Sequence, residues 1–218
     1  MGALLALHVA AGTVALTTGP VAMLSRKGGT IHVAWGRVFG VAMLLVALSS
    51  LVLGVAHNRQ FLVFVGLFTL QLLLSGYRAL RIRRDGVARF DLGLQIVALG
   101  MGVGFLAWGV RSLLGGDPFG YLALGFGVGS AALATRWIRL LRSPATDRTL
   151  WLRHHLIGMG AAYIATATAA LVVNVHRVPS SLPFWAWWIL PTVLGAPLIG
   201  RAARRVRITR RDEPMTAA

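Results

Sequence analysis

The chain contains no cysteine, and this absence excludes disulfide bonds, thiolate metal sites and cysteine nucleophiles. Acidic residues are also scarce, with six Asp and Glu against 22 Lys and Arg, and all six are expected in loops, at helix ends or in the C-terminal tail. A carboxylate pair at membrane depth is therefore not expected, which argues against a proton-pumping relay and an intramembrane aspartyl hydrolase. The last apolar stretch lacks lysine, so a retinal Schiff base of the rhodopsin kind is excluded as well.

What the chain has is apolar sequence: 56% of its residues are hydrophobic and only 13% are charged, unlike an ordinary soluble domain. Seven apolar stretches each approach the roughly 20 residues that cross about 30 Å of hydrocarbon as a helix. They are Ala3–Met23, Val33–Ala56, Phe61–Ile82, Leu92–Leu114, Phe119–Leu141, His155–Val175 and Phe184–Ile199. The sequence therefore predicts an all-α integral membrane bundle of seven transmembrane helices within residues 1–200, followed by a basic cytoplasmic tail, 201–218, that we expect to be disordered.

Positive charge alternates from loop to loop along these stretches. Only Arg59, Arg111 and Arg177 fall on one side, and the other 19 of the 22 Lys and Arg fall on the opposite side. Because the side rich in Lys and Arg stays in the cytoplasm, we expect the N-terminus outside and the C-terminus in the cytoplasm of a bacterial cytoplasmic (inner) membrane. The expected partner of the arginine-rich face is the anionic lipid of that leaflet, not nucleic acid.

Small residues and prolines favour a second interpretation, a small-solute or lipid transporter. Glycines recur in the fourth and fifth stretches, with Gly102 and Gly127 at their centres, and small residues let helices approach closely in lipid. The seventh stretch holds Pro191 and Pro197, each of which removes a backbone hydrogen bond and bends a helix. Kinked helices line substrate sites in transporters, although a proline more often only bends the helix.

Histidines supply the candidate ligands. His32 and His155 are expected at the same depth, near the cytoplasmic face, and neutral imidazole is a common metal ligand and axial ligand of haem iron. His8 lies about five residues inside the first stretch, hence roughly 8 Å below its outer end. Its partner for ligation would be His57 or His176, and the alternative is a buried imidazole that is hydrogen-bonded to a neighbouring helix.

Three local patterns together resemble a known family. They are His8 with a small-residue stretch that ends at Gly19-Pro20, the segment 32–37 (His-Val-Ala-Trp-Gly-Arg), and His155 with Met159 and Tyr163 four and eight residues later. This combination is similar to that of a bacterial family of multi-pass membrane proteins, the domain of unknown function 2306 family, although the last segment departs from the family pattern. A weaker similarity links the histidine layout to membrane b-type cytochromes. The family resemblance points to His8, His32 and His155 as the candidate cofactor-binding residues, and the similarity to b-type cytochromes makes haem b the candidate cofactor.

We identify no set of catalytic residues in the sequence. The leading prediction is a membrane protein that binds haem or transfers electrons, with His32 and His155 as ligands near the cytoplasmic face and His8 near the outer one. The alternatives are the transporter and an accessory subunit whose helices pack against a membrane-protein partner.

Overall fold

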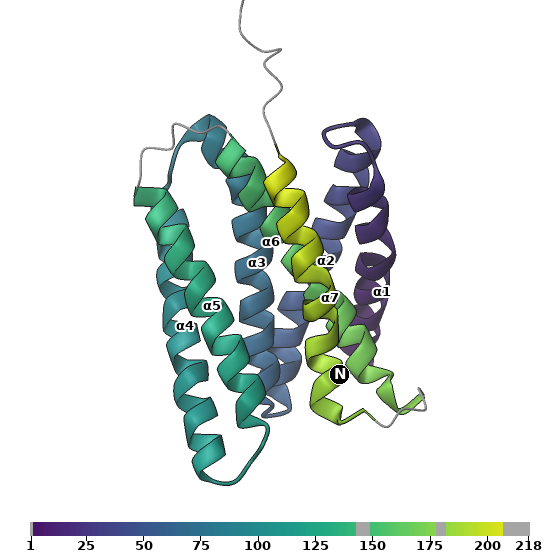
Figure 1. Cartoon of the computed structure of the whole chain (residues 1–218). Coiled ribbons are helices and arrows are strands. Elements are labelled where there is room, and N and C mark those ends of the chain that lie inside the picture. Colours follow the sequence, from purple (N-terminus) through teal and green to yellow (C-terminus); the bar gives the residue numbers. More distant parts are fainter. Residues whose placement is uncertain (1, 143–148, 178–181, 207–218) are drawn as a thin grey trace, which may run out of the picture.

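The computed structural model describes residues 2–142, 149–177 and 182–206 of the 218-residue chain. Within these ranges the protein is all-helical, with seven α-helices that run alternately up and down a bundle (Figure 1). The helices are α1 (Gly2–Leu24), α2 (Thr30–Ala56), α3 (Gln60–Asp85), α4 (Arg89–Leu114), α5 (Gly120–Arg142), α6 (Thr149–Val173) and α7 (Phe184–Arg205), and a short 3-10 helix, η1 (Val175–Arg177), follows α6. The predicted all-α fold class is confirmed for the described residues.

Five of these helices, α1, α2, α3, α4 and α6, are long and apolar enough to cross a membrane. The chain is therefore described as a multi-pass membrane protein. Helices α5 and α7 are of similar length but contain no segment that is apolar enough to meet this criterion. In α5 the cause is its many glycines and the arginines of its last turn, and in α7 it is the tryptophans, prolines and terminal arginines.

Helices α3 and α6 form the centre of the bundle. Helix α3 packs against α2, α4 and α6, whereas α6 packs against α1, α3 and α7. Helices α4 and α5 pair with each other as one hairpin, and α1 and α2 pair as another (Figure 1). The two hairpins lie on opposite sides of the α3–α6 centre, so these two helices connect one hairpin to the other.

The helices approach each other most closely at glycines. A Cβ atom on Gly158 of α6 would lie 2.6 Å from the Cα atom of Gly76 on α3, so neither position can carry a side chain without moving a helix. Gly102 of α4 meets Gly127 of α5 in the same way, as the glycine pattern predicts, with 2.9 Å from a Cβ on Gly127 to the carbonyl oxygen of Gly102. Because lipid tails are as apolar as the helices, such close packing is what holds membrane helices together.

The two ends of the bundle differ in composition. Helices α1, α3, α5 and α7 end, and α2, α4 and α6 begin, at the upper end in Figure 1, and these helix ends carry most of the arginines. Toward the opposite end Phe61 of α3 lies at the centre of an aromatic cluster. Its ring centroid is 4.7–6.3 Å from those of Phe105, Trp108, Phe119, Phe126 and Trp188. Trp188 of α7 thus packs against α3 and α5.

Five helices extend by three or more residues beyond the apolar stretches that predict them. Helix α2 begins at Thr30 instead of Val33, α4 at Arg89 instead of Leu92, and α6 at Thr149 instead of His155. Helix α3 continues to Asp85 instead of ending at Ile82, and α7 to Arg205 instead of Ile199. Polar residues are tolerated in a terminal turn, where side chains reach beyond the apolar layer, so hydropathy marks these ends too early. The remainder of the predicted tail, 207–218, lies outside the described residues.

Candidate functional site

His32 and His155 come together between α2 and α6. Their ring centroids are 6.5 Å apart and their planes are inclined by 77°. Both imidazoles are half-buried, His32 in the first turn of α2 and His155 in the second turn of α6. These are the two residues that their common depth in the sequence predicts as a pair.

Each of the two rings is oriented by a carbonyl group of another helix. The Nδ1–H group of His32 donates to the carbonyl oxygen of Ala22 at the end of α1, at 2.8 Å. That of His155 donates to the carbonyl oxygen of Gly76 on α3, at 2.9 Å. Because a carbonyl oxygen only accepts, both nitrogens must carry the proton, and Nε2 of each neutral ring keeps its lone pair. This is the arrangement that metal-binding histidines adopt.

The α3–α6 crossing explains how His155 reaches its acceptor. Gly76 and Gly158 let the two backbones touch, and His155 lies three residues before Gly158, on the turn that passes the carbonyl group of Gly76. A larger residue at either glycine would separate the helices and lengthen this hydrogen bond. The orientation of the His155 imidazole thus depends on Gly76 and Gly158, two residues without a side chain.

The end of α1 is held by residues of the following turn and by α2. Lys27 donates through Nζ to the carbonyl oxygen of Met23, and the ring of His32 satisfies Ala22. Partial burial lowers the pKa of the Lys27 ammonium group below its ordinary value. The last carbonyl groups of a helix have no partner in the helix itself, so both side chains serve as caps.

Tyr163 continues the face of α6 that begins at His155 and joins it to α1. Its ring contacts the backbone of Gly19 so closely that a Cβ atom there would collide with it. Its hydroxyl group donates to the carbonyl oxygen of Leu16 at 3.4 Å. Pro20 has no N–H group and leaves that carbonyl without its helical donor, and Tyr163 replaces the missing bond. The segments that carry the sequence resemblance therefore meet along one contact between α1, α2 and α6.

His8 lies apart from this pair. Its Nδ1 atom is hydrogen-bonded to Ser49 Oγ of α2 at 2.8 Å, which matches the interhelical role that the sequence left as the alternative. It precedes Ala22 by 14 residues along α1, or about 21 Å at 1.5 Å per residue, so it cannot share a ligand with His32. His154 is buried, with its ring 4.9 Å from that of Trp137 and its Nδ1–H group bonded within α6.

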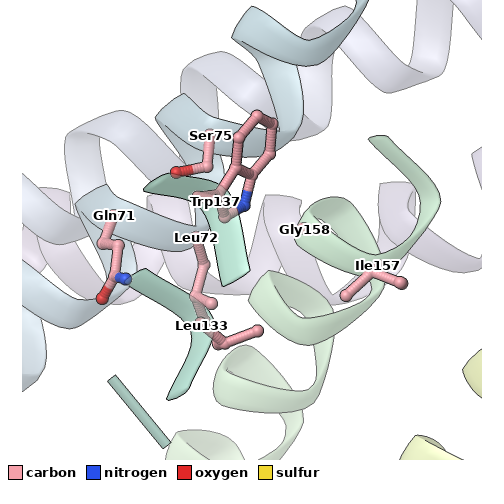
Figure 2. A pocket seen from close by; sticks show the side chains of 7 residues that line it. All are labelled: Gln71, Leu72, Ser75, Leu133, Trp137, Ile157 and Gly158. Carbon is pink, nitrogen blue, oxygen red and sulfur yellow. The ribbon is translucent and has the colours of Figure 1, made fainter. Parts of the chain in front are cut away.

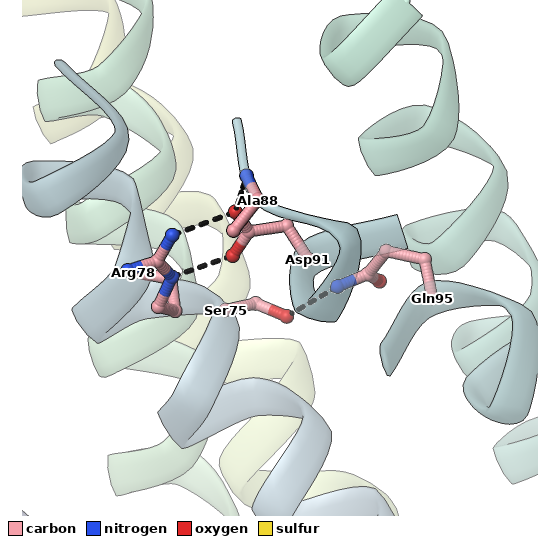
Figure 3. Close-up of polar contacts among 5 residues, drawn as sticks. All are labelled: Ser75, Arg78, Ala88, Asp91 and Gln95. Carbon is pink, nitrogen blue, oxygen red and sulfur yellow. Dashed lines mark hydrogen bonds and ion pairs between the residues drawn. The ribbon is translucent and has the colours of Figure 1, made fainter. Parts of the chain in front are cut away.

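A buried ion pair, Arg78 with Asp91, was not foreseen from the sequence. Asp91 has only 2% of its surface exposed, and its two oxygens accept from Nε and Nη2 of Arg78 at 2.5 and 2.7 Å (Figure 3). One of them also accepts from the N–H group of Ala88, at 2.8 Å, which caps α4. One turn further along, Gln95 donates to Ser75 Oγ at 2.9 Å. The signal in the sequence is an acid in the first turn of one helix and an arginine near the end of the preceding one.

The ligand set available in the described residues is limited to the two histidines. In that part of the chain no group of three or more His, Cys, Asp or Glu side chains is placed to hold a metal ion. Structural zinc sites use four protein ligands, and sites for calcium use six to eight oxygen ligands. The His32–His155 pair alone suits only a metal that brings most of its own ligands.

Comparison of the chain with known protein families, with curated proteins and with solved structures finds no match.

Proposed function

We propose that this membrane protein binds haem b through His32 and His155 and takes part in electron transfer. The observation that supports the proposal is the pair of half-buried imidazoles, each held by a backbone carbonyl group and each without a partner for Nε2 in the described residues. His8 also makes one bond to another helix, but His32 and His155 in addition lie beside each other, with ring centroids 6.5 Å apart.

Haem suits a site that offers only two protein ligands. The porphyrin would supply four nitrogens to its iron, so His32 and His155, whose ring centroids lie 6.5 Å apart, would be the only protein ligands required. When bound, haem supplies one-electron chemistry, and the carbonyl groups of Ala22 and Gly76 keep both imidazoles in the ligating tautomer.

The setting that we propose is a bacterial cytoplasmic membrane that all seven helices cross, with the N-terminus outside. The uneven distribution of arginine between the two ends of the bundle supports this orientation. In it the histidine pair lies near the cytoplasmic face, and the exposed arginines contact anionic lipid. Membership of the domain of unknown function 2306 family is part of the same proposal, supported by the meeting of the His32, His155 and Gly19-Pro20 segments. The role of His8 as a further ligand, toward the other end, stays a prediction.

An absorption spectrum of the purified protein, oxidised in air and then reduced with dithionite, tests the proposal. We expect a sharp reduced α-band at one haem per chain. His32→Ala or His155→Ala should abolish it, and His57→Ala, at an exposed position after α2, should leave it unchanged. A colourless protein, produced with haem in excess, would overturn the proposal. Equal pigment in the wild type and both histidine variants would overturn the ligand assignment.

A further inference from the structure

Two buried hydrogen-bonded groups lie on one face of α3, separated by a single turn. In the first, Ser130 Oγ of α5 lies 2.8 Å from Gln71 Oε1 and 2.9 Å from the carbonyl oxygen of Ala98 on α4. In the second, Gln95 of α4 donates to Ser75 Oγ. All four side chains are at most 3% exposed. No hydrogen bond joins the first group to the second within the described residues.

A small cavity lies where these two groups would meet. It is formed by α3, α5 and α6, and Gln71 and Ser75 supply its polar wall (Figure 2). Its other walls are apolar or aromatic, among them Leu72, Leu133 and Trp137. The volume of ≈ 10 Å³ is at the lower limit for one water molecule, for which roughly 10–15 Å³ is needed.

Hydrogen-bond capacity remains on both polar walls. Ser75 Oγ accepts a bond from Gln95, but its own proton has no acceptor in the described part of the chain. Gln71 uses one amide proton in a long bond of 3.4 Å to the carbonyl oxygen of Ser130, and its second amide proton and a lone pair of Oε1 remain. A buried polar atom without a partner costs about 1–3 kcal/mol, and at membrane depth neither lipid nor bulk water can supply one.

We propose that one water molecule occupies this cavity and bridges Ser75 and Gln71. It accepts the Ser75 proton and donates to Gln71 Oε1, a span that one water molecule suits because residues four apart on a helix have Cβ atoms about 5–6 Å apart. The water joins the two groups into one chain from Gln95 on α4, through α3, to Ser130 on α5. The direct bonds of Gln95 and Ser130 already attach α4 and α5 to α3, and the water links these two attachments to each other. This site does not depend on the binding of haem.

Radiolytic footprinting of the protein in lipid nanodiscs tests the site, because short X-ray pulses split bound water and oxidise the side chains that touch it. The reporter is Leu72, which lines the cavity and is 4% exposed. The control side chain is Leu122, which is also buried but belongs to no part of the cavity wall. We expect oxidation of Leu72 and none of Leu122 in the wild type.

Two variants, Ser75→Ala and Gln71→Met, should each cause loss of Leu72 oxidation, because one remaining polar wall does not hold a buried water. Ser50→Ala is the matched variant: Ser50 is buried, but its hydroxyl group already donates to the carbonyl oxygen of Leu62, and Leu72 should be oxidised as in the wild type. Absence of Leu72 oxidation in the wild type would show a dry cavity and overturn the proposal. Undiminished oxidation in both Ser75→Ala and Gln71→Met would overturn the assignment of the ligands.

Discussion

The histidine pair and the Arg78–Asp91 pair bring side chains of different helices together toward the same end of the bundle, but they differ in what remains free. Both carboxylate oxygens of Asp91 are occupied, one of them twice, and the charges cancel. Within the described residues, each imidazole of the other pair makes a single bond to a carbonyl group, and its second nitrogen has no partner. The first pair is complete within the protein, whereas the second is not.

This difference separates polar residues that stabilise a membrane fold from those that are candidates for chemistry. A polar group in an apolar medium is costly, and the cost is removed when every donor and acceptor has a partner. By this criterion the role of Arg78 and Asp91 is structural: they fix α3 against α4. His32 and His155 retain lone pairs that the protein orients but does not use. The following changes test the comparison, in order of expected effect.

Asp91→Asn should cause the largest loss of stability. The change removes the charge that is hydrogen-bonded to the guanidinium group of Arg78, and we expect a loss of about 3 kcal/mol in the free energy of unfolding, the low end for a broken buried pair. The low end applies because the Arg78 side chain keeps 19% of its surface exposed. Denaturant unfolding in detergent micelles, followed by circular dichroism, measures the effect.

Asp85→Asn is the matched control, since Asp85 is exposed at the end of α3 and should change stability little. The double variant Arg78→Leu with Asp91→Leu should recover most of the loss, because it removes both charges together. Equal effects of Asp91→Asn and Asp85→Asn would contradict the view that this pair fixes α3 against α4.

Gly158→Ala should have an intermediate effect on stability and should also disturb the orientation of His155. The new methyl group meets the backbone of Gly76, so α3 and α6 must separate, at a cost of about 2 kcal/mol. Separation also moves the acceptor of His155, so haem content measured by absorbance should fall together with the melting temperature. Gly125→Ala, at a position where a Cβ atom meets nothing within 4 Å, should alter neither quantity. Unchanged stability of Gly158→Ala would show that the helices are not in contact at this point.

Tyr163→Phe should have the smallest effect, about 1 kcal/mol, because it removes one neutral hydrogen bond and keeps the ring against Gly19. The loss should shrink when Pro20 is replaced by Ala, because the new N–H group can satisfy the carbonyl oxygen of Leu16 from within α1. A double-mutant cycle of thermal unfolding measures this coupling. Additive effects of the two substitutions would mean that Tyr163 does not replace the bond that Pro20 lacks.

The sequence predicts the helices well because each apolar stretch has the length of a membrane span, and five of the seven helices are both long and apolar enough to cross a membrane. It also predicts that His32 and His155 meet, since two positions at equal depth need only a suitable arrangement of helices. It does not predict the burial of Asp91. A residue at the boundary of an apolar stretch can face water or the bundle, and hydropathy assigns no direction. Nor does it reveal which glycines touch: Gly102 packs and Gly100 has open space, although the two are separated by one residue.

The hydrogen bonds that orient the two histidines have a consequence for how this protein tolerates mutation. Their acceptors are the main-chain oxygens of Ala22 and Gly76, and every amino acid carries such an oxygen. A site oriented by a carboxylate can be lost through one base change in the codon of that carboxylate. Here no substitution deletes an acceptor, and only a change large enough to displace a helix disturbs it. The orientation of both rings therefore depends on the path of the backbone, and it is retained when the surrounding side chains change.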